Sequence, residues 1–125
     1  VQYAYARINS VFRFSNLNLN KKIRMSSKKF TLNQHEIGIL KKILEWPRCL
    51  EISLNKLEPH RITFYLYELV TLFHAYWNLG KDKKEFRFIS KSGQLNNERL
   101  VLLQVLSIVI KNGMSILGVS TPKSM

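Results

Sequence analysis

The chain has 125 residues, of which 46% are hydrophobic and 22% are charged, a composition that excludes a disordered chain and is typical of one globular domain. Twenty lysines and arginines against eight acidic residues give a net charge of +12, which favours a polyanionic partner such as nucleic acid. The longest nearly apolar run, 100–110, is about half as long as the ~20 residues that cross a bilayer, and Cys49 is the single cysteine and cannot close an internal disulfide. We therefore expect a cytoplasmic domain without a membrane-spanning segment, cut from a longer protein because it begins at Val1.

The first two predicted helices flank a lysine-rich loop. Residues 1–14 carry apolar side chains at helical spacing, whereas 16–29 has no period and is rich in Asn, Ser and Lys. Asn33 and Glu36 have the spacing of a capping box, so a second helix should begin there and run to about Glu45. Its core face is expected to consist of Ile37, Leu40 and Leu44.

The third and fourth predicted helices each begin at a proline. Pro47 opens the third, because a missing N–H costs nothing in the first turn, and this helix is expected to run through Leu50, Leu54 and Leu57. The fourth begins near Pro59 and is expected to end at Gly80. Its buried stripe is predicted to comprise Ile62, Tyr65, Leu66, Leu69, Phe73, Tyr76 and Trp77.

The last part of the chain contains a long connection and a very apolar helix. In the connection 81–96, the alternation over 86–89 hints at an extended segment packed on the bundle. The fifth helix, about 97–112, is apolar nearly all round and should be deeply buried, with Gly113 ending it. The predicted fold class is all-α, a bundle of about five helices.

The cationic residues gather in two stretches that lie mainly between the predicted helices. A lysine- and asparagine-rich surface can serve only to keep a small domain soluble, but clustering favours binding to a polyanion. One cluster comprises Lys21, Lys22, Arg24, Lys28 and Lys29, and the other comprises Lys81, Lys83, Lys84, Arg87 and Lys91.

The candidate functional side chains are aromatic and cationic. Tyr3 and Arg7 lie one helical turn apart, so a ring can stack on an unstacked base while the guanidinium meets a phosphate or base edge. Phe73 and Trp77 repeat this spacing, although an aromatic stripe on a helix more often packs in a core. His74 is expected in an aromatic cluster or as a surface donor, since the three histidines have no local metal-ligand spacing.

Residues 58–78, from Glu-Pro-His-Arg to His-Ala-Tyr-Trp-Asn, closely resemble the anticodon-binding domain of bacterial arginyl-tRNA synthetases. The stretches 1–7 and 97–119 agree with the same family in the right order. The resemblance implies that 1–125 is one domain of the class I synthetase anticodon-binding type. The catalytic domain would lie elsewhere in the same chain, so this part alone would not aminoacylate.

The resemblance also implies a site and partners. The family grips the anticodon loop of arginine tRNA with the first-helix motif, the aromatics near the end of the fourth helix and the chain terminus. It implies a monomer that binds no membrane and holds no cofactor in this domain, while the parent enzyme uses ATP, magnesium and arginine. The implied RNA contacts are Tyr3, Arg7, Phe73, Tyr76, Trp77 and Met125.

The last residues, 120–125, are too short and polar to form a core element. We expect Pro122 to direct the chain back across the bundle, so that the flexible Met125 side chain packs beside Tyr3 and Trp77. The alternative is a frayed terminus.

Two other functions fit a basic helical chain. It could be the anticodon-binding domain of another class I synthetase, although the arginine-type motifs at both ends argue against this. It could also be a basic module that binds RNA, a membrane surface or an acidic protein. A membrane-surface helix needs a cationic face opposite an apolar one, and the lysines here lie in predicted loops.

Overall fold

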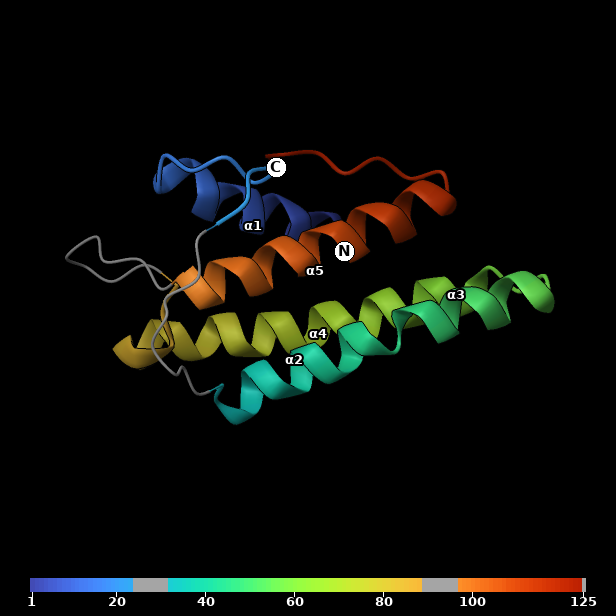
Figure 1. Cartoon of the computed structure of the whole chain (residues 1–125), viewed down its shortest axis with the longest axis horizontal. Coiled ribbons are helices and arrows are strands. Elements are labelled where there is room, and N and C mark those ends of the chain that lie inside the picture. The colour runs from blue at the N-terminus through green and yellow to red at the C-terminus, as the bar shows by residue number, and fades with distance from the viewer. Residues whose placement is uncertain (24–31, 89–96, 125) are drawn as a thin grey trace.

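The computed structural model of the chain describes residues 1–23, 32–88 and 97–124, and all regular structure in these ranges is helical. α4 and α5 lie side by side along the long axis, α1 covers one side, and α2 and α3 follow each other along the other side (Figure 1). The predicted all-α bundle of five helices is confirmed. The elements are α1 (Gln2–Phe14), α2 (Gln34–Leu44), α3 (Trp46–Asn55), α4 (His60–Asp82), the short 3₁₀ helix η1 (Lys84–Phe86) and α5 (Asn97–Ile116).

The core lies between α4 and α5 and is completed by α1 and α2. The predicted buried stripe of α4 is confirmed except at Trp77, which is half-buried. α5 is less deeply buried than expected, because Ile108 is 57% exposed. By length and composition alone α5 could cross a membrane, yet half of its most apolar window is buried inside the bundle. The largest fully buried side chains are Phe12, Ile8, Ile39, Ile62, Leu66, Leu69, Phe73, Tyr76, Leu100, Leu103, Leu106 and Ile110.

The predicted start of α2 is confirmed. The Asn33 side chain accepts hydrogen bonds from the N–H groups of His35 and Glu36, both at 2.9 Å, and the Glu36 carboxylate accepts one from the Asn33 N–H at 3.1 Å. This reciprocal capping box satisfies N–H groups that the first helical turn leaves free. α3 begins one residue before Pro47.

The core face of α2 and the end of α3 differ from those predicted. α2 buries Ile39 and Ile43, whereas Leu44 is 70% exposed. The two stripes are neighbours on the helix surface, and Ile39 and Ile43 share the buried face of α2 with Glu36, which pairs with Arg99 of α5. The third helix was expected to run through Leu57, but it ends at Asn55, and Leu57 lies in the left-handed region at φ +54°.

Two glycines that were expected to end helices lie inside them. A Cβ at Gly113 would lie 2.9 Å from the Leu66 Cδ1 atom. A Cβ at Gly80 would lie 3.3 Å from both the Phe86 carbonyl oxygen and the Arg87 Cγ atom. Both glycines therefore permit close approach of another segment, and the predicted helix ends at these positions were wrong.

Replacing Gly113 by alanine is expected to lower the free energy of unfolding by about 1–2 kcal/mol, because the new methyl group must displace the buried Leu66. Gly38→Ala is the matched control inside α2, where nothing lies within 4 Å of the added Cβ. It should stabilise the protein by roughly 0.5–1 kcal/mol through helix preference. Urea unfolding of both variants measures the difference, and equal stabilisation would contradict the close contact at Gly113.

The segment after α4 folds back onto the helix that precedes it. The Arg87 side chain donates from Nε to the Gly80 carbonyl at 2.5 Å and from Nη2 to the Lys81 carbonyl at 3.1 Å. These are carbonyls of the last turn of α4, which lack partners within the helix. Packing against the bundle is confirmed by the buried Phe88 ring, although η1 replaces the start of the predicted extended segment and Ile89 lies outside the described residues.

Candidate nucleic-acid interface

The Arg7 guanidinium connects two aromatic rings at the crossing of α1 and α4. Its Cζ atom lies 4.6 Å from the centre of the Tyr3 ring and 4.8 Å from that of the Trp77 ring, both within cation–π range. Nη2 also donates a hydrogen bond to the Tyr3 hydroxyl at 2.7 Å. The Tyr3 side chain is 51% exposed, so one face of this cluster is open to a ligand.

His74 lies beside the same cluster, as the sequence led us to expect. Its Nδ1 atom is 3.5 Å from Arg7 Nη1, and its ring stacks on Tyr3 with centroids 5.9 Å apart. Burial, and then the positive charge of Arg7, lower the pKa of His74. A neutral imidazole keeps one nitrogen free to accept a hydrogen bond from the guanidinium.

This pKa shift predicts how stability depends on pH. Because the folded-state pKa of His74 lies below the ordinary value of about 6.5, its contribution is complete above that pH and is lost as pH falls toward the lowered value. The melting temperature of the wild type should therefore fall more steeply below about pH 6.5 than that of His74→Gln. His60→Gln, an exposed control, should keep the wild-type slope. Parallel curves for the wild type and His74→Gln would show that another group titrates.

Two predicted RNA contacts lie in the core. Phe73 and Tyr76 are fully buried, and the structure places both rings behind the surface instead of on it. The ring centroids of Phe73 and Trp77 are 6.0 Å apart. The ring centroid of Phe88 lies 5.2 Å from that of Tyr76 and 5.7 Å from that of Trp77. These rings hold the Trp77 indole in place. Helical spacing alone does not show which rings of an aromatic stripe are buried supports and which are exposed to a ligand.

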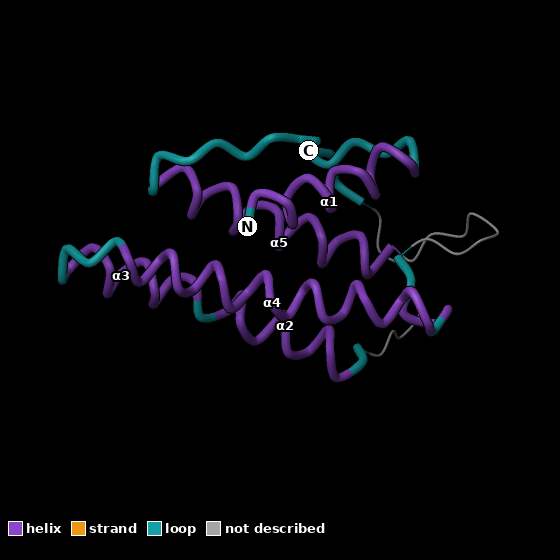
Figure 2. Tube along the Cα trace, turned by 180° about the vertical axis from the view of Figure 1, so that it is seen from behind, coloured by secondary structure: helices purple, strands orange, loops and turns teal. Residues whose placement is uncertain are grey.

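The C-terminal tail completes a groove beside Tyr3 and Arg7. From α5 the tail runs back over the bundle toward α1, and the opposite view agrees (Figures 1 and 2). Gln2 Nε2 donates to the Ser120 carbonyl at 2.9 Å, so the predicted return of the tail is confirmed up to Ser124; Met125 lies outside the described residues. The groove has a volume of about 300 Å³ and is lined by Tyr3, Arg7, Ser10, Arg13, Trp77 and Ser124.

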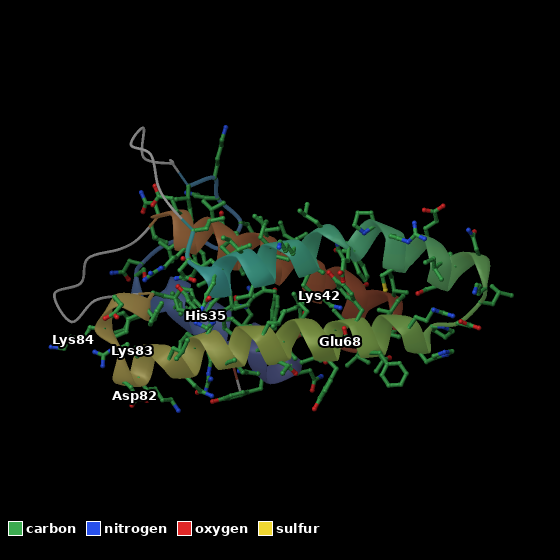
Figure 3. The ribbon with its side chains drawn as sticks, turned by 90° about the horizontal axis from the view of Figure 1, so that it is seen from below. His35, Lys42, Glu68, Asp82, Lys83 and Lys84 are labelled. Carbon is green, nitrogen blue, oxygen red and sulfur yellow. The ribbon has the colours of Figure 1, made fainter. Side chains whose placement is uncertain are left out.

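Trp77 also borders a second, larger pocket of about 470 Å³. This pocket lies between α1, the end of α4 and residues 86–88. Sequence reasoning did not identify it, and the alternation over 86–89 was the one available signal. Lys83 and Lys84 extend from the nearby end of α4 (Figure 3). The pocket is lined by Val11, Trp77, Lys81, Phe86, Arg87 and Phe88.

The comparisons with known proteins agree with this geometry. The DALR anticodon binding domain matches residues 1–125. Arginine–tRNA ligases of Pelagibacter ubique and Rhizobium meliloti are 52% and 40% identical, over 100% of this chain and 22% of each relative, so the chain spans about a fifth of their length. Crystal structures of arginyl-tRNA synthetases from Campylobacter jejuni and Plasmodium falciparum match with TM-scores of 0.78 and 0.69. Their identities are 25% and 26%, and the matches cover 99% and 98% of this chain and 25% and 20% of those chains. The chain therefore belongs to the DALR anticodon-binding domain family.

Proposed function

We propose that this chain binds the anticodon loop of arginine tRNA, as part of an arginine–tRNA ligase whose catalytic domain lies in the same protein. The observation that carries the proposal is the open groove in which Arg7 lies against both the Tyr3 and Trp77 rings. Its support is the family match over 1–125 and the 52% identity to an arginine–tRNA ligase. The net charge of +12 would strengthen binding to any RNA without selecting a sequence.

The groove offers the contacts that an unstacked loop nucleotide needs. The exposed Tyr3 ring provides a stacking face, and base–aromatic stacking is worth about 1–3 kcal/mol per base. The Arg7 guanidinium can donate in a fork to a phosphate or a base edge. His74, by accepting from Arg7, holds that fork in its orientation. Met125 would add an adaptable apolar contact at the end of the tail.

The proposed role in the parent ligase is to position tRNA. That enzyme would join arginine to tRNA with ATP and magnesium at its catalytic domain, and this chain would hold the distant anticodon loop. We place the function in the cytoplasm, on a monomer that does not bind membrane. An RNA-binding module without tRNA selectivity is the second candidate, and the charge of the chain alone would suffice for it.

Binding of hairpin RNAs tests the proposal. The chain should bind a hairpin that carries the anticodon arm of arginine tRNA more tightly than the same hairpin with a non-arginine anticodon. Tyr3→Ala should weaken binding to the arginine hairpin by about 1–3 kcal/mol with little change in melting temperature, since the ring is half exposed. Tyr67→Ala, an exposed ring of α4 that does not line the groove, should bind like the wild type. Equal affinity for both hairpins would support the module without tRNA selectivity.

A further inference from the structure

The second pocket beside Trp77 has the features of a nucleotide subsite. Its inner wall is apolar, because Val11 and Phe88 are buried and the Trp77 and Phe88 rings stack at 5.7 Å and 29°. Its volume of about 470 Å³ falls within the range of small-molecule sites, roughly 300–1,000 Å³. A planar, apolar ligand can therefore enter and lie against fixed rings.

Positive charge surrounds the opening of this pocket. Lys81 is exposed on the last turn of α4, and the Arg87 side chain is held by its two hydrogen bonds to the carbonyls of that turn. Lys83 and Lys84 lie just beyond (Figure 3). The cations of 81–87 outnumber the two acidic residues, Asp82 and Glu85, so the net charge of this segment is positive. Planar apolar walls and a cationic rim together match a nucleobase that carries a phosphate.

Trp77 joins this pocket to the groove of Tyr3 and Arg7. Its indole lines both, so ligands in the two sites would lie next to the same ring. Successive nucleotides of a single-stranded loop can be splayed apart and held in this way. A ligand of one continuous RNA strand fits both sites better than two independent small molecules, because the two sites share Trp77 and each is lined by cationic side chains.

We propose that the pocket of Val11, Trp77, Lys81, Phe86, Arg87 and Phe88 binds a second unstacked nucleotide of the RNA whose first base stacks in the Tyr3–Arg7 groove. This inference rests on the proposed RNA-binding function. The base lies against the aromatic wall, and Lys81 contacts its phosphate. Arg87 acts as a positioning residue, since it fixes residues 86–88 against α4.

Fluorescent base replacement in the arginine-tRNA hairpin tests this subsite with the whole chain. 2-Aminopurine is placed at one loop position at a time, and stacking on a ring quenches its emission. Two loop positions should be quenched when the wild-type protein binds. Tyr3→Ala should restore emission at one of them, and Phe86→Leu, which keeps an apolar side chain in the wall, should restore emission at the other. Quenching at one position only, or restoration of both by Tyr3→Ala alone, would overturn the second subsite.

Salt dependence provides an independent measurement. Lys81→Ala should lower the slope of log affinity against log salt by about 0.7, the value for one phosphate contact on a single strand. Lys111→Ala is the matched control, an exposed lysine on α5 that does not line the pocket, and it should keep the wild-type slope. Equal slopes for the two variants would remove Lys81 from the site.

If the wild type does not prefer the arginine hairpin at all, the proposed function itself fails. Preference for that hairpin with a single quenched position contradicts only the second subsite.

Discussion

Arg7→Ala is expected to weaken binding to the arginine anticodon hairpin by about 3 kcal/mol, a loss of more than a hundredfold. The variant removes the guanidinium fork, and a bidentate contact to a base is worth roughly 1–3 kcal/mol. It also removes the group that holds the Tyr3 and Trp77 rings, since Arg7 contacts both. Fluorescence anisotropy with the labelled hairpin measures the loss, and circular dichroism checks that the helices persist.

Two further substitutions separate charge from geometry at this position. Arg7→Lys keeps the charge but not the planar fork, so it should recover only part of the affinity. Arg13→Ala removes a cation from the rim of the same groove and should lower the salt slope by about 0.7 with little loss of anticodon preference. If Arg7→Lys binds and discriminates like the wild type, Arg7 contributes charge alone.

The largest effect on stability is expected at the ion pair between the N-terminal ends of α2 and α5. Glu36 Oε2 lies 3.5 Å from Arg99 Nε, and both side chains are largely buried. Glu36 also closes the capping box of α2, while Arg99 donates to the Arg87 carbonyl at 3.0 Å. Removing one partner of a buried pair costs about 3–5 kcal/mol. Glu36→Ala should therefore consume much of the 5–15 kcal/mol that is typical of a domain.

Urea unfolding of a small set of variants tests this expectation. Glu68→Ala breaks the ion pair between Glu68 and Lys42, in which the Glu68 side chain is 62% exposed. This substitution should lower the free energy of unfolding by no more than about 1 kcal/mol. Glu36→Ala combined with Arg99→Met removes both charges, so its cost should be less than the sum of the single substitutions. A cost below about 1 kcal/mol for Glu36→Ala would show that water screens the pair.

Local chemistry made the helix starts predictable. The Asn33–Glu36 capping box and the proline in the first turn of α3 are short-range signals, and the structure follows both. The helix ends at Gly80 and Gly113 were not predictable from the same kind of signal. Gly80 is approached by residues 86–87 of the connection after its own helix, and Gly113 by Leu66 of another helix. Glycine alone does not distinguish such a contact from a helix end.

In the candidate site, contacts within one helix were likewise predictable and contacts between elements were not. Tyr3 and Arg7 are one turn apart on α1, so their contact follows from helical geometry. The buried positions of Phe73 and Tyr76 depend on Phe88, which reaches them from the connection after α4. The second pocket depends on Arg87 holding that connection to the end of α4. A single sequence does not specify how a connection folds back, because its side chains act across different elements.

The bond from Gln2 to Ser120 joins positions 118 residues apart in sequence. Contacts of such separation are slow to form because the loop-closure entropy is large. Within this domain Tyr3 and Arg7 are synthesised before the other helices, yet their groove acquires the wall at Ser124 only after α5 has been made. A truncated chain that ends at α5 would retain a packed core but lack this wall. RNA binding at the groove would thus distinguish a folded domain whose tail is in place from a helical one that stops at α5.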